Sequence, residues 1–188
     1  MIRIGITGSL ASGKSTASRF ISNNNGPLFS ADKEVKKFYK NKAFQKKIIK
    51  IFKLKKKSNI KKQIKTEVIN KKINLKMLEK ILHPLVRKKM HLFLKNNKKK
   101  KFVFLEIPLL VESRLMKYFD VVIFIRSRTE TRLKRFLKRG GSVRIFKILN
   151  KQQLKDSSKM KVCDHIVVNN NTLSSLKKKL FNIIKLYE

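Results

Sequence analysis

Residues 2–15 read IRIGITGSLASGKS, a short apolar run followed by a glycine-rich turn and the start of a helical stretch. Gly8 to Ser15 match the pattern G-x-x-x-x-G-K followed by Ser or Thr, between an expected strand at 2–7 and an expected helix at 14–22. Glycines let the backbone turn so tightly that its N–H groups point at phosphate oxygens, and the helix that begins there adds its positive end. The stretch therefore predicts a P-loop that binds a nucleoside triphosphate.

Several side chains of this loop have an expected task. Lys14 would reach the β- and γ-phosphates, Ser15 would place its hydroxyl on Mg²⁺, and Thr16 would lie beside the α-phosphate. The sequence contains no N-K-x-D motif for guanine and is short for a motor protein, which favours a kinase that uses ATP and Mg²⁺. The loop residues expected to bind ATP are Gly8, Ala11, Ser12, Gly13, Lys14, Ser15 and Thr16.

Apolar runs and helical stretches alternate along the rest of the chain. Such alternation indicates an α/β fold with a mainly parallel sheet of about five strands between helices, the three-layer P-loop NTPase fold. We expect Pro84 to divide one helical stretch into two helices, and 53–62 to be a loop. The expected strands are 2–7, 28–30, the first part of 102–112, 120–125 and 165–168, and the expected helices are 14–22, stretches within 32–52, 64–69, 75–94, 129–139, 143–152 and 173–186.

Length and cysteine content indicate a single domain in a reducing compartment. The chain has 188 residues and one cysteine, Cys163, so it cannot form an internal disulfide. Its first apolar run is too short for a membrane span and lacks the basic start and long apolar core of a signal peptide. We therefore expect a cytoplasmic protein with no membrane partner. We also expect it to act as a monomer.

The net charge of +38 permits two interpretations. Such a field attracts polyanions, which would suit a nucleic-acid-binding protein or an acidic membrane surface. However, 39 of the 49 basic residues are lysines spread along most of the chain, and tryptophan is absent. The abundant residues have AT-rich codons, so a biased genome would produce this composition without selection for binding. We favour compositional drift, and expect no specific nucleic-acid partner.

Two segments near the N-terminus resemble those of the dephospho-CoA kinase family. GITGSLASGKST at 5–16 resembles the opening strand and P-loop of that family, and FSAD at 29–32 resembles its D-A-D segment. The resemblance implies that Asp32 is the general base for the ribose hydroxyl of the acceptor, a task that a carboxylate performs in phosphoryl transfer. Without the resemblance, an aspartate at this place would be interpreted as a helix N-cap.

The middle of the chain extends the resemblance into the acceptor-binding region. Residues 83–87 resemble the H-P-x-x-R segment of the family, which implies that His83 contacts the substrate and that Arg87 pairs with its pyrophosphate. Lys62 stands where an arginine is common in this region. EIPLLVE at 106–112 resembles the D-x-P-L-L-x-E run, which implies that Glu106 helps to hold Mg²⁺ through water.

The last third of the chain resembles the lid and base-binding loop of the family. TETRLKRFLKR at 129–139 resembles the lid, and within it Arg135 and Arg139 would share a helix face because they are four residues apart. The resemblance implies that Arg135 binds ATP and that Arg139 stabilises charge on the moving phosphoryl group. A solvated basic helix is the alternative. Gln153 and the stretch CDHIVVN at 163–169, which ends in Asn169, resemble the closing Q…A-D-x-x-I-x-N pattern of the family, whose loop lies near the adenine.

The resemblance covers nearly the whole chain and implies one domain with three functional regions. Residues 1–31, 96–126 and 153–188 would form the core, 32–95 the helical acceptor-binding region and 127–152 the lid. The implied reaction is ATP-dependent phosphorylation of dephospho-CoA to coenzyme A. The alternatives are a nucleoside monophosphate kinase and a basic nucleic-acid-binding protein that keeps a vestigial P-loop. Departures from the family pattern lie at Ser9, Ala11, Ser30, Glu106 and in the lid, where Gly140 and Gly141 replace an acidic segment.

The excess of positive charge leads to a prediction about stability. Repulsion among the 49 basic residues, which 11 acidic residues cannot balance, opposes the compact state and is screened by salt. We expect the melting temperature to rise by about 3 °C or more between about 0.02 M and about 0.5 M NaCl. A melting temperature that stays constant or falls over this range would contradict the prediction.

Overall fold

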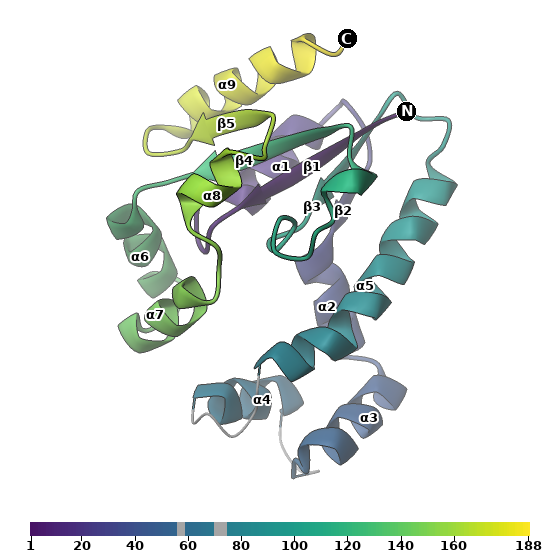
Figure 1. The fold of residues 1–188 in the computed structure, drawn as a ribbon, viewed down its shortest axis with the longest axis vertical. Helices are drawn as coiled ribbons and strands as arrows, with labels where there is room; N and C mark the ends of the chain where they lie inside the picture. Colours follow the sequence, from purple (N-terminus) through teal and green to yellow (C-terminus); the bar gives the residue numbers. More distant parts are fainter. Residues whose placement is uncertain (56–58, 70–74) are drawn as a thin grey trace. The chain divides into compact units, whose positions relative to one another are not determined.

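The computed structural model describes residues 1–55, 59–69 and 75–188 (Figure 1). The chain forms two compact units, which we describe separately. The first unit contains residues 1–30 and 96–188 and holds the P-loop; the second contains residues 31–95.

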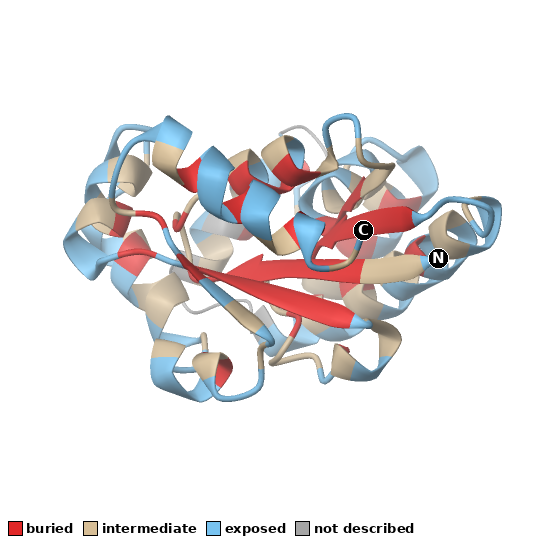
Figure 2. Ribbon diagram, turned by 90° about the horizontal axis from the view of Figure 1, so that it is seen from above, coloured by how far each residue is buried: buried red, intermediate tan, exposed pale blue. Residues whose placement is uncertain are grey.

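The first unit is built on a five-stranded sheet in which every neighbouring pair is parallel, and the strand order is β2-β3-β1-β4-β5. Central strands are buried on both faces, which is why they read as continuous apolar runs in the sequence (Figure 2). The predicted fold class and strand positions are confirmed. The strands are β1 (Ile2–Gly8), β2 (Leu28–Ser30), β3 (Phe102–Glu106), β4 (Val121–Arg126) and β5 (His165–Val168).

Two helices of this unit, α1 (Lys14–Ser22) and α9 (Leu173–Lys185), contribute to the main hydrophobic core. Their apolar residues recur at helical spacing, so one face of each helix joins the buried strands. Members of this core include Ile4 and Ile6 of β1, Ala17 and Ile21 of α1, and Leu176, Leu180 and Ile184 of α9. This packing fixes the end of β1 and the start of α1, the two elements that the P-loop connects.

The remaining helical elements of the first unit are a 3₁₀ helix (Met116–Tyr118), α6 (Thr129–Leu137), α7 (Val143–Lys151) and α8 (Asp156–Met160). Sequence patterns did not predict α8, because five residues without apolar periodicity give no helical signal. The α6 helix ends at Leu137, so the predicted helical range to Arg139 was two residues too long.

The second unit consists of α2 (Ala31–Phe38), α3 (Lys42–Phe52), α4 (Ile60–Ile69) and α5 (Leu75–Asn96), of which the last residue lies in the first unit. Its core contains Phe44, Ile48, Ile60, Ile64, Leu78 and Leu82. Because α4 begins at Ile60, the loop predicted for 53–62 was too long at its C-terminal end; its residues 56–58 lie outside the described residues.

The predicted break at Pro84 was wrong, because α5 continues through this residue. Proline has no N–H and cannot donate to the carbonyl four residues earlier, at Lys80. The Pro84 ring is exposed, while Leu82 before it and Met90 after it are buried. Packing on both sides of the proline therefore compensates for the missing hydrogen bond, as tertiary contacts commonly do for weak helical sequences.

The continuous helix predicts that Pro84→Ala stabilises the protein. The substitution restores a backbone donor and removes the steric conflict of a proline in a helix interior, so we expect the free energy of unfolding in urea to rise by about 1–3 kcal/mol. Pro27→Ala, outside any helix, is the matched control and should not stabilise. A loss of stability in Pro84→Ala would mean that the helix needs the proline ring.

Candidate active site

The P-loop connects the end of β1 to the start of α1, and its two glycines have no room for a side chain. Gly8 has φ 153° and Gly13 has φ 100°, both on the side of φ that side chains disfavour. A Cβ at Gly8 would collide with the carbonyl oxygen of Ile125, and one at Gly13 with the side-chain amide of Asn169. The glycines are therefore required by backbone conformation and by space.

Ala11 departs from this rule, because it has φ 59° although it carries a Cβ. This left-handed conformation costs an alanine about 1–2 kcal/mol relative to its preferred ones. Other contacts of the loop must therefore stabilise the left-handed conformation of Ala11, because an alanine by itself does not favour it.

The peptide unit between Ser12 and Gly13 is held from outside the loop. The Ser12 carbonyl accepts a hydrogen bond from Nδ2 of Asn169 at 2.8 Å and another from Nη1 of Arg135 at 3.3 Å. The N–H of a trans peptide points opposite to its C=O, so these contacts direct the Gly13 N–H away from Asn169. The two residues expected to bind ATP from outside the P-loop thus lie against the loop itself.

Lys14 is buried and its Nζ donates to the carbonyl of Ser9 at 2.9 Å. That carbonyl also accepts from the backbone N–H of Ser12 at 3.1 Å, which closes a tight turn. The ammonium group is therefore held inside the loop, beside the N–H groups that P-loops direct at phosphates.

Glu106, at the C-terminal end of β3, forms a cluster with three serine hydroxyls. It is 3% exposed and accepts hydrogen bonds from Ser15, from Ser18 at 3.3 Å and from Ser30 at 3.1 Å. The strand register brings these groups together, because Glu106 of β3 pairs with Ile6 of β1 and with Ser30 of β2. Ser30, which stands for the first aspartate of the family segment, thus supports the carboxylate of Glu106.

This cluster fits Mg²⁺ brought by a nucleotide. Ser15 and Glu106 offer the hard oxygen atoms that Mg²⁺ prefers, next to the Lys14 end of the loop. Within residues 1–55, 59–69 and 75–188, no group of three or more His, Cys, Asp or Glu side chains could hold a metal ion. In nucleotide sites Mg²⁺ is commonly held by one or two carboxylates together with phosphate and water oxygens.

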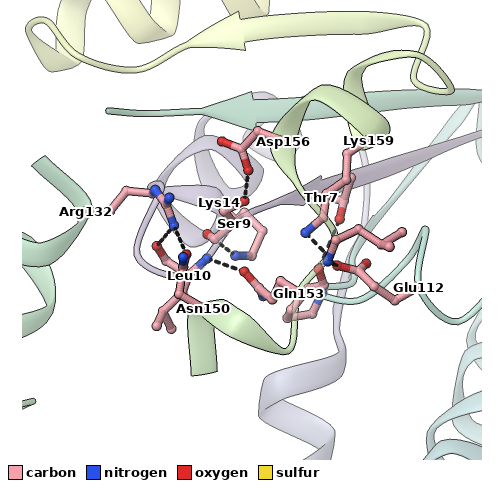
Figure 3. Close-up of polar contacts among 12 residues, drawn as sticks. Thr7, Ser9, Leu10, Lys14, Glu112, Arg132, Asn150, Gln153, Asp156 and Lys159 are labelled. Atoms are coloured by element: carbon pink, nitrogen blue, oxygen red, sulfur yellow. Dashed lines mark hydrogen bonds and ion pairs between the residues drawn. The ribbon is translucent and has the colours of Figure 1, made fainter. Parts of the chain in front are cut away.

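The first half of the P-loop is bound by side chains that sequence reasoning did not place there (Figure 3). Ser9 donates its hydroxyl to Asp156, and the N–H of Leu10 donates to Oε1 of Gln153 at 2.9 Å. Nη1 of Arg132 lies 3.4 Å from the Leu10 carbonyl. No spacing in the sequence could reveal these contacts, because each joins residues more than 120 positions apart. Arg132 and Gln153 also line a cleft of about 910 Å³ beside the loop.

The two lid arginines have different positions. Arg135 is partly buried, and in addition to the Ser12 contact it donates to Ser127 at 3.2 Å and to the carbonyl of Asn169 at 3.1 Å. Burial lowers the pKa of Arg135 below its usual value, and the nearby charge of Arg139 lowers it further. Arg139 is exposed and follows the end of α6, so it lies near Arg135 without sharing its helix.

The expected acceptor-binding residues all lie in the second unit. Asp32 is the second residue of α2 and is exposed. The alternative that it precedes the helix as an N-cap is wrong, because α2 begins one residue earlier; in the first turn its charge still favours the helix. Lys62 on α4 is exposed, and its N–H donates to the side chain of Asn59 at 3.2 Å.

His83 and Arg87 lie one turn apart on α5. Burial lowers the pKa of His83 below its ordinary value; the Glu79 carboxylate opposes this shift and the Arg87 charge adds to it. The neutral form of His83 is thus favoured, whereas Arg87 is exposed. Their roles toward an acceptor stay predictions.

Comparison with known proteins gives the same family as the sequence motifs. The dephospho-CoA kinase family model matches residues 2–175. Dephospho-CoA kinase from Rickettsia typhi is 35% identical over 98% of this chain and 97% of its own length, and that from Fusobacterium nucleatum is 34% identical over 94% of each chain. The structure of dephospho-CoA kinase from Campylobacter jejuni superposes with a TM-score of 0.62 at 27% identity, covering 99% of this chain and 97% of that one.

The contacts around Ser12 predict that Asn169→Asp weakens ATP binding. The variant replaces the Nδ2 donor with an acceptor that repels the Ser12 carbonyl, so the Gly13 N–H loses its orientation. We expect the Kd for ATP, measured by calorimetry, to rise about tenfold, which corresponds to about 1.4 kcal/mol.

Asn170→Asp is the matched control because it adds the same charge one residue later. The Oδ1 of Asn170 accepts from Ser127 and from the N–H of Arg128, and aspartate retains both contacts. Equal weakening in the two variants would attribute the effect to charge alone and contradict the proposed orientation of the Gly13 N–H.

Proposed function

The chain belongs to the dephospho-CoA kinase family, and from this we propose that it transfers the γ-phosphoryl group of ATP to the ribose 3′-hydroxyl of dephospho-CoA, giving coenzyme A and ADP. The observation that carries the proposal is the P-loop, in which Lys14 is held inside the turn while the Ser12 carbonyl is bound from outside. Family membership favours neither a nucleoside monophosphate kinase nor a nucleic-acid-binding protein with a vestigial P-loop.

On the donor side, the backbone N–H groups of the loop and the Lys14 ammonium would bind the β- and γ-phosphates. Ser15 and Glu106 would hold Mg²⁺, the first directly and the second through water. When bound, this ion supplies neutralising charge to the phosphate oxygens. Ser18 and Ser30 keep the Glu106 carboxylate oriented toward Ser15 by donating to its other oxygen.

On the acceptor side, the Asp32 carboxylate would orient the ribose hydroxyl and accept its proton as the oxygen attacks the γ-phosphorus. Support comes from the family motif and from chain connectivity, because Asp32 follows Ser30, a neighbour of Glu106, by two residues. His83, Arg87 and Lys62 would bind the rest of dephospho-CoA; the Arg87 guanidinium suits its pyrophosphate.

The lid would supply the remaining positive charge. Arg135 would bind the ATP phosphates and Arg139 would stabilise charge on the transferred group, because a guanidinium group forms charge-assisted hydrogen bonds with phosphate oxygens. We propose that residues 127–152 move as this lid, that 32–95 form the acceptor-binding region, and that the rest of the domain is the core. A closed lid would exclude water and so suppress ATP hydrolysis.

The protein is also proposed to be a monomer in the cytoplasm; its single cysteine, Cys163, supports the reducing compartment. Across the residues that the structure describes, no helix is both long and apolar enough to span a bilayer.

The test of the function is ADP formation from ATP and Mg²⁺ with different acceptors. Dephospho-CoA should give turnover well above a reaction without acceptor, whereas AMP and CMP should not. Turnover with AMP or CMP alone would identify a nucleoside monophosphate kinase. If dephospho-CoA gives no more ADP than the blank, the proposal is wrong.

The role of Asp32 predicts a specific kinetic defect. Asp32→Asn keeps the size of the side chain but cannot accept the proton, so kcat should fall by about 10²-fold or more while the Kd for ATP changes by less than about twofold. Glu34→Gln is the matched control on the same helix, because it removes an acid that forms an ion pair with Lys37 and has no part in the proposed transfer. A kcat in Asp32→Asn as high as that of Glu34→Gln would exclude Asp32 as the base.

A further inference from the structure

Leu10 in the P-loop has both of its polar backbone groups bound by side chains from the C-terminal third of the chain. Its N–H donates to Oε1 of Gln153 at 2.9 Å, and its carbonyl accepts from Nη1 of Arg132 at 3.4 Å (Figure 3). Neither contact belongs to a helix or a strand. The conformation of the loop at Leu10 therefore depends on residues of α6 and of the segment that follows α7.

Arg132 is itself held rigidly for this contact. It is 4% exposed, and its Nη1 also donates to Oδ1 of Asn150 at 2.7 Å while Nη2 donates to Oγ1 of Thr129 at 3.1 Å. Its guanidinium carbon lies 5.7 Å from the centre of the Phe146 ring, a cation–π distance. Burial lowers the pKa of Arg132, and the nearby Asp156 carboxylate opposes this shift.

The contact at the Leu10 carbonyl sets the direction of the next N–H group. In a trans peptide the N–H and the C=O point in opposite directions, so a Leu10 carbonyl held toward Arg132 directs the Ala11 N–H away from Arg132. Asn169 has the same effect on the Gly13 N–H through the Ser12 carbonyl. The two contacts thus orient alternate peptide units of one loop.

We propose that Arg132 is a positioning residue for nucleotide binding, which holds the Leu10–Ala11 peptide so that the Ala11 N–H faces the phosphates of ATP. Ala11 makes this contact necessary. Its φ of 59° is disfavoured for a residue with a Cβ, and a flip of the Leu10–Ala11 peptide would change φ of Ala11 and relieve the conformation. Arg132 opposes this flip because the flipped carbonyl would leave the guanidinium.

This inference rests on the proposed function only in that the P-loop binds ATP or ADP; it is independent of the acceptor. The test therefore measures ADP binding by calorimetry without dephospho-CoA. In Arg132→Met, which keeps the stem but removes the donors, the Kd for ADP should rise about tenfold. Lys134→Met is the matched control: it removes a positive charge from an exposed position of the same helix and should change the Kd by less than about twofold.

A second readout separates positioning from general destabilisation. In ¹H–¹⁵N correlation spectra, the amides of Ala11 and Gly13 should both shift when ADP is added to the wild-type protein. In Arg132→Met the shift of the Ala11 amide should be lost while that of Gly13 persists, because Asn169 still holds the Ser12 carbonyl. Loss of both shifts with a lower melting temperature would indicate a structural role and overturn the proposal.

A third experiment removes the contact to the Leu10 N–H, alone and together with the Arg132 contact to the Leu10 carbonyl. Gln153→Met removes the contact to the Leu10 N–H, and the double variant with Arg132→Met should lose less affinity than the product of the single losses, since both contacts hold one residue. Losses that multiply would show that the contacts act independently and contradict a shared role.

If Arg132→Met does not fold, Arg132→Lys carries the test. Lysine keeps the charge but has no fork to reach Leu10 and Asn150 together, so the Kd for ADP should rise about threefold with a reduced Ala11 shift. Wild-type affinity and a wild-type Ala11 shift in Arg132→Lys, or in Arg132→Met where that folds, would overturn the proposal. Turnover with dephospho-CoA plays no part in this result, so failure of the proposed function and failure of this inference are distinguishable.

Discussion

The orientation of a few peptide units in the P-loop is the constraint on which the donor site depends. In P-loops, backbone N–H groups bind the phosphate, and each N–H can face a phosphate only if the carbonyl of the same peptide faces outward. An outward carbonyl inside a protein needs a donor. In this chain the donors for Leu10 and Ser12 are side chains, from Arg132, Asn169 and Arg135.

The parallel sheet determines why these side chains can reach the loop. β1 lies between β3 and β4, and Gly8 at its end pairs with Ile125, so the loop begins where several strands end together. Glu106 reaches Ser15 from the neighbouring β3, and the residues after β4 and β5 provide Arg135 and Asn169. The sheet thus brings four distant parts of the sequence together beyond the C-terminal ends of its strands. In open parallel sheets, ligands bind at this end.

The basic residues of this chain differ in burial and in their contacts. Most lysines among the described residues are exposed, whereas Lys14, Arg132 and Lys159 are buried and make defined contacts. Lys159 is 0% exposed and lies 2.6 Å from Glu112 in an ion pair. A buried cation needs such a partner because its desolvation is costly, so burial with a partner distinguishes structural and functional charges from solvated ones.

The sequence by itself determined the fold class, the strand positions, the P-loop and the family, because these follow from local periodicity and from residues close together in the chain. Only the tertiary structure decided that α5 passes through Pro84, that α6 stops before Arg139, and that Arg132, Gln153 and Asp156 hold the loop. Each of these depends on packing or on contacts between residues far apart, and no local pattern records which distant side chain will meet an outward carbonyl.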